Sequence, residues 1–253
     1  MAEQIIGRLL EKNILKECYE SDKAEFIAVY GRRRIGKTFL IKSFFKDKFD
    51  FYTTGIYQGT KKEQLSFFNK QLCEYSRMAY PQVDNWFDAF DQLKHYLSTK
   101  KGKAVVFIDE LPWLDSPRSR FVKALELFWN SWAAEQSNIK FIVCGSATTW
   151  MISHLLGDKG GLHNRITRRI KLMPFNLSET EAYLKAQGIV WNRYQIAEAY
   201  MIMGGTPYYL QKLRKEYSLS QNIDSLFFSD TAELKDEYIF LFRSLFNDSS
   251  IYK

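Results

Sequence analysis

Gly31-Arg32-Arg33-Arg34-Ile35-Gly36-Lys37-Thr38 fits the pattern G-x-x-x-x-G-K-[ST]; it follows an apolar run at residues 26–30 and opens a helical pattern. In this setting the glycines let the loop fold back, so that its main-chain N–H groups point at phosphate oxygens. The positive end of the following helix reinforces that attraction. The stretch therefore predicts a nucleotide phosphate site between a strand and a helix.

Individual residues of this loop have expected contacts with the ligand. Lys37 would bridge the terminal phosphates, and Thr38 would offer its hydroxyl to Mg²⁺, a cation that takes few protein ligands. For residues 32–34 a solvated basic turn is slightly favoured over specific phosphate contact. The residues predicted to bind the cofactor here are Gly31, Arg34, Ile35, Gly36, Lys37, Thr38 and Phe39.

A second motif occupies residues 104–110 and reads Ala-Val-Val-Phe-Ile-Asp-Glu. Its apolar run suits a strand that is buried on both faces, and two carboxylates follow where that strand ends. The motif resembles a Walker B: Asp109 would hold the Mg²⁺ shell, while Glu110, turned to the other side, would polarise a water against the γ-phosphate. Turn chemistry is the alternative, and the phosphate loop favours the functional interpretation.

A third apolar run ends in small and hydroxylated residues at 144–149. Ligands of open α/β sheets lie at the carboxyl ends of the strands, so this segment should face the nucleotide. We expect Ser146 to orient the lytic water or to sense the γ-phosphate. The equally weighted alternative is that Ser146 caps a helix beginning near Thr149.

Strand-like and helical patterns alternate along most of the chain, which predicts a parallel sheet. From Ser178 onward the pattern is helical and no strand is predicted. Ser178 to Glu181 offers a helix start, and Gly204 to Pro207 interrupts the helical pattern. We therefore predict an ATPase core at residues 1–175 and a small helical domain at 176–253. The expected strands are 26–30, 49–53, 104–109, 139–144 and 166–172, and the expected helices of the core include 61–77, 86–98 and 118–136.

Composition excludes several classes of protein. The chain has 253 residues, 46% hydrophobic and 26% charged, which is typical of a folded protein and not of a disordered one. Its apolar runs are too short to cross a membrane, and no secretory signal is recognisable, so a soluble, cytoplasmic protein is expected. Three separated cysteines and three histidines predict neither a disulfide framework nor a metal site. The net charge of +7 is compatible with an anionic ligand or nucleic acid.

Several spaced motifs together resemble the archaeal and bacterial AAA-type ATPases allied to the STAND group. The resemblance implies a five-stranded parallel sheet of order 5-1-4-3-2, an ATP site and a helical lid. It also implies that Gly7 and Arg8 approach the adenine, and that a turn ending at Pro207 closes over the base; a simple helix breaker is the alternative for that turn. The motifs that carry it are Ile5 to Arg8, Gly31 to Thr38, Asp109 to Pro112, Gly145-Ser146, Arg165 with Arg168-Arg169, and Gly204 to Tyr208.

Arg165 is the least secure of these matches. Many relatives show a Pro-Leu-x-Gly-Arg stretch where this chain has Gly161-Leu162-His163-Asn164-Arg165, so only the arginine agrees. Arg165 is predicted to be a γ-phosphate sensor or a finger that reaches a neighbouring subunit of a homo-oligomer. The alternative is that it belongs to a basic edge strand with its neighbours.

The resembling ATPases usually continue into a winged-helix and a nuclease-like domain. Apolar residues crowd the end of this chain, from Tyr238 to Tyr252, which is unusual for a free tail. We therefore expect that this segment forms a helix packed on the lid or another copy, that the native protein extends beyond Lys253, and that DNA is a partner through the missing part.

The function that these motifs predict is an ATP-binding, Mg²⁺-dependent ATPase that hydrolyses slowly and acts as a nucleotide-driven switch. Two alternatives belong to other classes: a DNA-binding module in which ATP is secondary, and a small-molecule kinase. GTP is disfavoured because no N-K-x-D base-reading motif occurs, and a dinucleotide enzyme because no G-x-G-x-x-G occurs.

Overall fold

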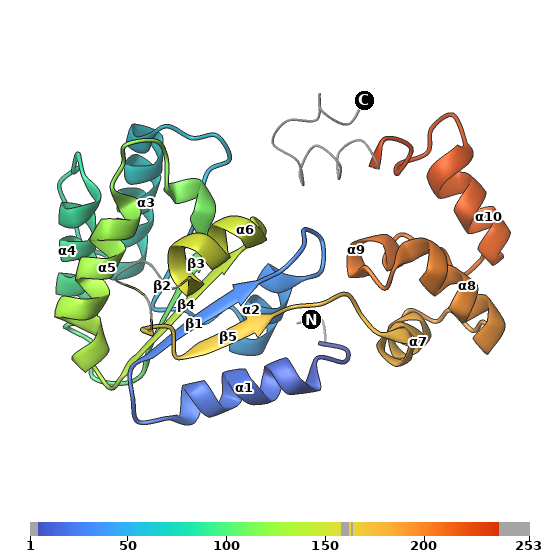
Figure 1. Cartoon of the computed structure of the whole chain (residues 1–253), viewed down its shortest axis with the longest axis horizontal. Coiled ribbons are helices and arrows are strands. Elements are labelled where there is room, and N and C mark those ends of the chain that lie inside the picture. The colour runs from blue at the N-terminus through green and yellow to red at the C-terminus, as the bar shows by residue number, and fades with distance from the viewer. Residues whose placement is uncertain (1–4, 158–161, 163, 238–253) are drawn as a thin grey trace. The chain divides into compact units, whose positions relative to one another are not determined.

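The computed structural model describes residues 5–157, 162 and 164–237 of the chain. The chain divides between Met173 and Pro174 into two compact units, close to the boundary expected at residue 175 (Figure 1). The first unit holds a sheet with helices on both faces, and the second is helical in its described part. The predicted fold class, a P-loop parallel sheet followed by helices, is confirmed.

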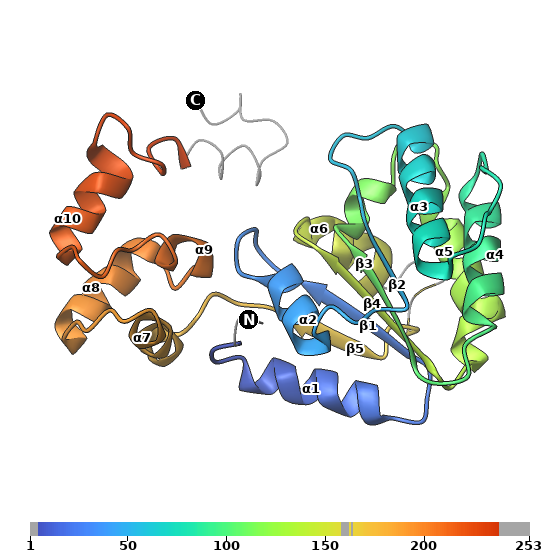
Figure 2. The ribbon, with the colours of Figure 1, turned by 180° about the vertical axis from the view of Figure 1, so that it is seen from behind.

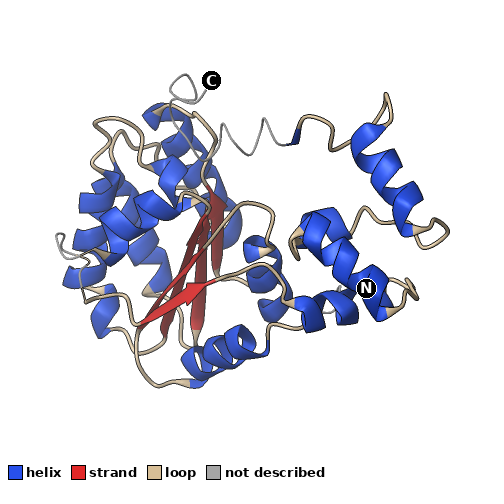
Figure 3. Ribbon diagram, turned by 45° about the vertical axis from the view of Figure 1, so that its right-hand side comes forward, coloured by secondary structure: helices blue, strands red, loops and turns tan. Residues whose placement is uncertain are grey.

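Five parallel strands form the sheet of the first unit (Figure 3). Their order is β2-β3-β4-β1-β5, which is the predicted order 5-1-4-3-2 counted from the other edge. All carboxyl ends therefore meet at one edge of the sheet, where the motif residues follow. The strands are β1 (Glu25–Tyr30), β2 (Phe51–Thr54), β3 (Ala104–Asp109), β4 (Ile139–Gly145) and β5 (Arg168–Lys171).

Two strands begin two residues later than predicted, and before each of them a side chain, in place of a carbonyl, accepts one N–H of the neighbouring strand. Before β2, the carboxylate of Asp50 accepts the Val105 N–H at 2.9 Å. Before β5, the hydroxyl of Thr167 accepts the Phe26 N–H at 3.1 Å. A side-chain acceptor satisfies the neighbouring strand's donor without extending the strand, so the apolar pattern alone placed these ends too early.

Helices cover both faces of the sheet, and alternation along the strands assigns each residue to one face. The helices α1 (Leu9–Glu20) and α2 (Lys37–Phe45) pack against one face, around Ile27, Phe107 and Cys144 (Figure 2). The opposite face packs around Phe26, Ile108 and Val143. Its covering helices are α3 (Lys61–Ser76), α4 (Trp86–Leu97), α5 (Phe121–Ser131) and α6 (Thr148–Met151).

The predicted helix at 118–136 is wrong at both ends. Arg120 has a left-handed φ of 59° just before α5. At the other end, Trp132 leaves the helix with φ −149°, and a separate 3₁₀ turn, Ala133–Glu135, follows. The apolar spacing that buries Phe128 and Trp129 within α5 continues beyond the end of the helix. The spacing therefore does not reveal where the backbone leaves the helix.

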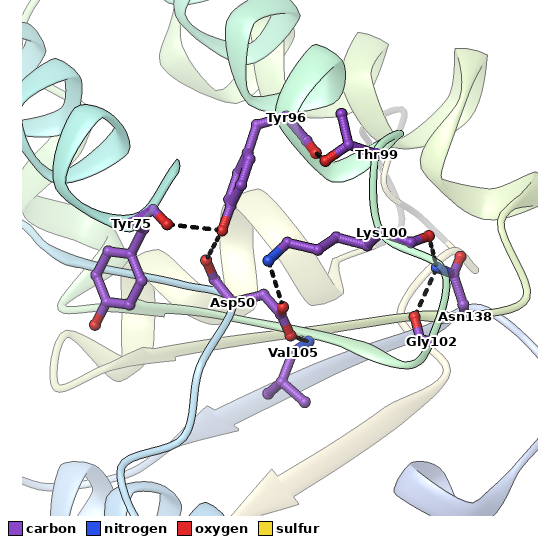
Figure 4. Close-up of polar contacts among 8 residues, drawn as sticks. All are labelled: Asp50, Tyr75, Tyr96, Thr99, Lys100, Gly102, Val105 and Asn138. Carbon is purple, nitrogen blue, oxygen red and sulfur yellow. Dashed lines mark hydrogen bonds and ion pairs between the residues drawn. The ribbon is translucent and has the colours of Figure 1, made fainter. Parts of the chain in front are cut away.

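A polar cluster ties four elements together at the amino edge of the sheet (Figure 4). The carboxylate of Asp50 forms an ion pair with Lys100 at 2.9 Å and accepts the Val105 N–H. The hydroxyl of Tyr96 lies 3.0 Å from the carbonyl oxygens of Asp50 and Tyr75. The cluster therefore joins α3 and α4 to the starts of β2 and β3.

The second unit contains α7 (Leu177–Ala186), α8 (Arg193–Met203), α9 (Pro207–Leu210) and α10 (Leu219–Ile223), around its own apolar core. The predicted helix start at Ser178 is wrong, because Asn176 forms the capping box with Glu179. The predicted break is confirmed: Gly204 ends α8 with φ 61°, and Pro207 opens α9. The expected terminal helix at residues 238–252 lies outside the described residues.

Within residues 5–157 and 164–237, no helix is both long and apolar enough to cross a membrane.

Candidate functional site

The loop at residues 31–38 connects β1 to α2 at the carboxyl edge of the sheet, as the motif predicts. Gly31 has φ 148°, and a Cβ there would lie 2.3 Å from the Leu172 carbonyl oxygen. Gly36, with φ 87°, is the residue before α2. A left-handed φ favours glycine, and the close approach at Gly31 leaves no room for a side chain. The two glycines allow the main chain of residues 32–36 to turn, and α2 begins after it without a side-chain cap.

Lys37 lies in this loop with its ammonium group directed at the loop itself and at β4. Its Nζ donates to the carbonyl oxygens of Gly31 at 3.1 Å and Arg32 at 2.9 Å, and to Ser146 Oγ at 2.9 Å. Desolvation by burial lowers the pKa of Lys37, and the carboxylates of Glu110 and Asp109 oppose that effect. Phosphate oxygens could replace these neutral acceptors and would return a full negative charge to the ammonium group.

Asp109 is the last residue of β3 and lies beside Thr38, the second residue of α2. Thr38 Oγ1 donates to Asp109 Oδ2 at 2.8 Å, while the Glu110 N–H and the Cys144 thiol both donate to Asp109 Oδ1. One hydroxyl and one carboxylate in contact are hard oxygen ligands that fit Mg²⁺. Among the described residues, no group of three or more His, Cys, Asp or Glu side chains could hold a metal by itself.

Glu110 and Ser146 form a pair across the ends of β3 and β4. Ser146 Oγ donates to Glu110 Oε1 at 2.6 Å, and the Ser146 N–H donates to Oε2 at 3.1 Å. Together with the Lys37 contact, these bonds make a chain from ammonium to hydroxyl to carboxylate. The capping alternative for Ser146 is wrong, because Ala147 occupies the cap position of α6 and the Ser146 hydroxyl is engaged elsewhere.

The arginines and Phe39 of the loop take different positions. Arg32 and Arg33 are exposed, Arg34 is half-buried with φ 69°, and Phe39 is 40% exposed at the start of α2. The Arg33 guanidinium lies 5.9 Å from the ring of Tyr57 and 5.7 Å from that of Trp113. No sequence motif points to these two aromatic neighbours, which follow β2 and β3 and lie close together because these strands are adjacent in the sheet.

Arg8 joins the phosphate loop to the end of the first unit. Its Nη1 donates to the Met173 carbonyl at 2.6 Å and its Nη2 to the Ile35 carbonyl at 3.3 Å, and it pairs with Glu11 at 3.8 Å. Gly7 and Arg8 both have left-handed φ angles, which bend the chain before α1. The expected approach of this bend to adenine stays a prediction.

Pro207 belongs to the second unit, where it opens α9 after the two glycines. Gly205 has φ 64°, and a Cβ there would lie 2.1 Å from the Phe175 carbonyl oxygen. The tight turn before Pro207 therefore has a structural cause within its own unit. The expected closure of Pro207 over the base stays a prediction.

Arg165 does not join the site. It is exposed and precedes β5, and the Thr167 N–H donates to Phe26 O near the start of β1. The residues before a parallel strand lie at its amino edge, and five residues separate Phe26 from Gly31, about 17 Å at about 3.3 Å each. This position does not support a γ-phosphate sensor within the same chain, and that role stays an untested prediction. The finger toward a neighbouring subunit stays a prediction.

Solved structures with related folds include three ATPases or motors of bacteria and archaea. The Walker-type ATPase of Pyrococcus abyssi matches with TM-score 0.65 and 17% identity, over 93% of this chain and 74% of that one. A STAND protein with a tetratricopeptide repeat sensor from Pyrococcus horikoshii matches with TM-score 0.56 and 18% identity, over 96% and 32%. The RuvB Holliday junction branch migration motor of Thermotoga maritima matches with TM-score 0.53 and 14% identity, over 98% and 77%. These similarities support the P-loop fold.

Two curated relatives come from Methanocaldococcus jannaschii. An uncharacterized protein is 25% identical over 257 residues and aligns with 98% of this chain, which spans 52% of that relative. An uncharacterized ATP-binding protein is 44% identical over 43 residues, 17% of this chain and 73% of that relative. Residues 6–213 match a family described as an ATPase domain predominantly from Archaea. Because that match covers both glycine-rich turns and both carboxylates of the site, the chain belongs to this family of ATPase domains.

Proposed function

We propose that the protein is a Mg²⁺-dependent ATPase whose nucleotide state acts as a switch. The observation that carries the proposal is the meeting of Lys37, Ser146, Glu110 and the Thr38–Asp109 pair at the mouth of one phosphate loop. A cation, a hydroxyl, a carboxylate and a metal-binding pair are the groups that phosphoryl transfer to water requires.

Each side chain has a role in this proposal. The loop N–H groups and Lys37 would bind the phosphates, and Thr38 and Asp109 would hold Mg²⁺, which would supply positive charge to the phosphates. Glu110 orients and deprotonates the attacking water. In the described structure Ser146 holds both carboxylate oxygens of Glu110. Each carboxylate oxygen can accept a second hydrogen bond, so Ser146 orients Glu110 while leaving it able to accept from a water.

The switch has a physical connection in Arg8. Its guanidinium bonds a carbonyl of the phosphate loop, at Ile35, and the carbonyl of Met173, the last residue before the boundary between the units. Phosphate binding that shifts Ile35 would change the geometry of both bonds. The end of the first unit would then respond to the occupant of the loop.

The proposal is tested by separating binding from turnover. Glu110→Gln keeps the shape of the side chain but removes the base, so we expect ATP affinity near wild type and turnover lowered at least a hundredfold. Lys37→Ala should abolish the thermal stabilisation by Mg-ATP, which is about 2.7 kcal/mol at a hundredfold excess over Kd. Lys42→Ala, on the same helix but in its last turn, is the matched control.

Equal turnover in Glu110→Gln and wild type would assign water activation to another group. An unchanged thermal shift in Lys37→Ala would place the nucleotide elsewhere and overturn the proposal.

A further inference from the structure

Cys144 lies beside the predicted Mg²⁺ ligand because of strand register. Parallel pairing matches Ile108 of β3 with Val143 of β4, so the next residues, Asp109 and Cys144, are neighbours on the two strands. Both follow the alternation that directs Phe107 and Ile142 to the face covered by α2. Their side chains consequently meet on the face from which Thr38 approaches.

The contact divides the two oxygens of Asp109 between different tasks. Oδ1 accepts the Cys144 thiol and the Glu110 N–H at 2.9 Å, both fixed by the sheet. Oδ2 faces Thr38 Oγ1 at 2.8 Å. With Oδ1 anchored by two donors, the carboxylate cannot rotate freely, and Oδ2 stays directed at the hydroxyl that would share the metal.

Cys144 is suited to this role by its surroundings. It is fully buried among the apolar side chains between the sheet and the helices α1 and α2. The only strong acceptor that its thiol contacts among the described residues is Asp109. Groups that orient metal ligands through hydrogen bonds change metal affinity by about 10- to 100-fold when they are removed.

We propose that Cys144 is a positioning residue that sets the Mg²⁺ affinity of the nucleotide complex by anchoring Oδ1 of Asp109. The inference rests on the proposed function, because it requires that ATP and Mg²⁺ bind at this site. Cys144 lies outside the phosphate loop and the acidic pair. Its removal should lower the affinity for Mg²⁺ and change the affinity for ATP without Mg²⁺ very little.

The experiment measures the Kd of ATP by calorimetry, once with Mg²⁺ and once with EDTA. The ratio of the two constants is the coupling between metal and nucleotide, and it requires no hydrolysis. In Cys144→Ala we expect this ratio to fall about tenfold while the Kd in EDTA changes less than threefold. Cys144→Ser, which keeps a donor, should retain the ratio within about threefold of wild type.

Two further variants make the test specific. Cys18→Ala removes another buried thiol from the same apolar cluster, and its coupling should equal that of wild type. Cys144→Val fills the space of the thiol without a donor, and it replaces Cys144→Ala in the test if the smaller variant unfolds.

The outcomes separate this inference from the proposed function. An unchanged ratio in the donorless variants overturns the inference, and so does an equal loss of affinity with and without Mg²⁺, which would indicate packing alone. A wild-type protein that does not bind ATP, or binds it equally in Mg²⁺ and EDTA, overturns the proposed function itself.

Discussion

Ser146 makes three hydrogen bonds to Lys37 and Glu110 through its hydroxyl and its N–H, and its effect on the site can be separated from that of Glu110. Its hydroxyl accepts from Lys37 and donates to Glu110, while its N–H holds the second carboxylate oxygen. Ser146→Ala keeps the N–H contact but breaks the chain through the hydroxyl. We predict turnover lowered about tenfold with ATP affinity changed less than threefold, because a misoriented base acts mainly on the transition state.

Steady-state kinetics and ATP titration on Ser146→Ala check this prediction, with Ser153→Ala as the control. The Ser153 hydroxyl is exposed, and it contacts the Trp150 carbonyl at 3.2 Å and Nδ1 of His154 at 2.8 Å, both in its own helical segment. Turnover at the wild-type rate in Ser146→Ala would show that the hydroxyl neither orients Glu110 nor senses the phosphate.

Individual residues could be predicted where one motif fixes their setting. Gly36, Lys37 and Thr38 lie where the loop pattern requires, and Asp109 meets Thr38 as a metal pair should. The Cys144 contact could not be found in this way, because it depends on which strands are neighbours and on their register. Arg165 shows a limit of motif matching: the resemblance implies a phosphate contact, whereas Arg165 precedes the amino end of β5, whose pairing with β1 begins at Arg168.

The half-buried carboxylate of Asp50 joins the starts of β2 and β3 to Lys100, which follows α4. Asp50→Ala removes the ion pair to Lys100 and leaves the Val105 N–H without its acceptor. We predict a loss of about 2 kcal/mol in the free energy of unfolding, because a backbone donor left without an acceptor costs more than the half-buried ion pair contributes. Asp50→Asn keeps an acceptor for Val105 and should cost about half as much.

Urea denaturation of the three proteins checks this order. The matched control is Glu74→Ala, which removes an exposed pair with Lys70 at 3.9 Å and should change the free energy of unfolding by at most about 0.5 kcal/mol. Equal losses for Asp50→Ala and Glu74→Ala would show that the cluster contributes no more than a surface charge.

Elements were predicted well where burial alone defines them and poorly where a polar side chain ends them. β3 has the predicted bounds because all six of its residues are buried. Ser178 with Glu181 predicts the start of α7, whereas the structure uses a capping pair two residues earlier, Asn176 with Glu179. The Phe175 N–H donates to the Gly205 carbonyl, so the chain is held outside the helix until residue 175 and the earlier cap is used. That bond comes from tertiary structure, which the local pattern does not contain.

At the scale of the whole molecule, the order of the strands came from a resemblance to known ATPases and was confirmed. Apolar periodicity predicts that strands exist and are parallel, but it does not determine which are neighbours. β5 illustrates the limit: its Arg168, Arg169 and Lys171 are exposed along a sheet edge, where charged side chains prevent pairing with other chains. Such a basic stripe therefore needs no nucleic acid to explain it.

Arg165 decides whether the site is completed by a second subunit. Because Arg165 precedes the amino end of β5, we expect that any action on the γ-phosphate is on the nucleotide of another copy. We predict that Arg165→Ala lowers turnover more than ATP affinity, since a guanidinium that meets charge developing in the transition state affects mainly kcat. Arg168→Ala, on the same basic edge, is the control.

A mixing experiment distinguishes the finger from a structural arginine. Arg165→Ala supplies an intact Glu110 and Glu110→Gln supplies an intact Arg165, so a mixed assembly contains complete sites that neither variant has alone. We expect activity in the mixture to exceed the sum of the two separate activities, with the excess rising with protein concentration as assembly requires. Wild-type turnover in Arg165→Ala, or no gain in a mixture that sedimentation shows to be assembled, would assign Arg165 to the charged edge of the sheet and leave each chain to hydrolyse ATP with its own residues.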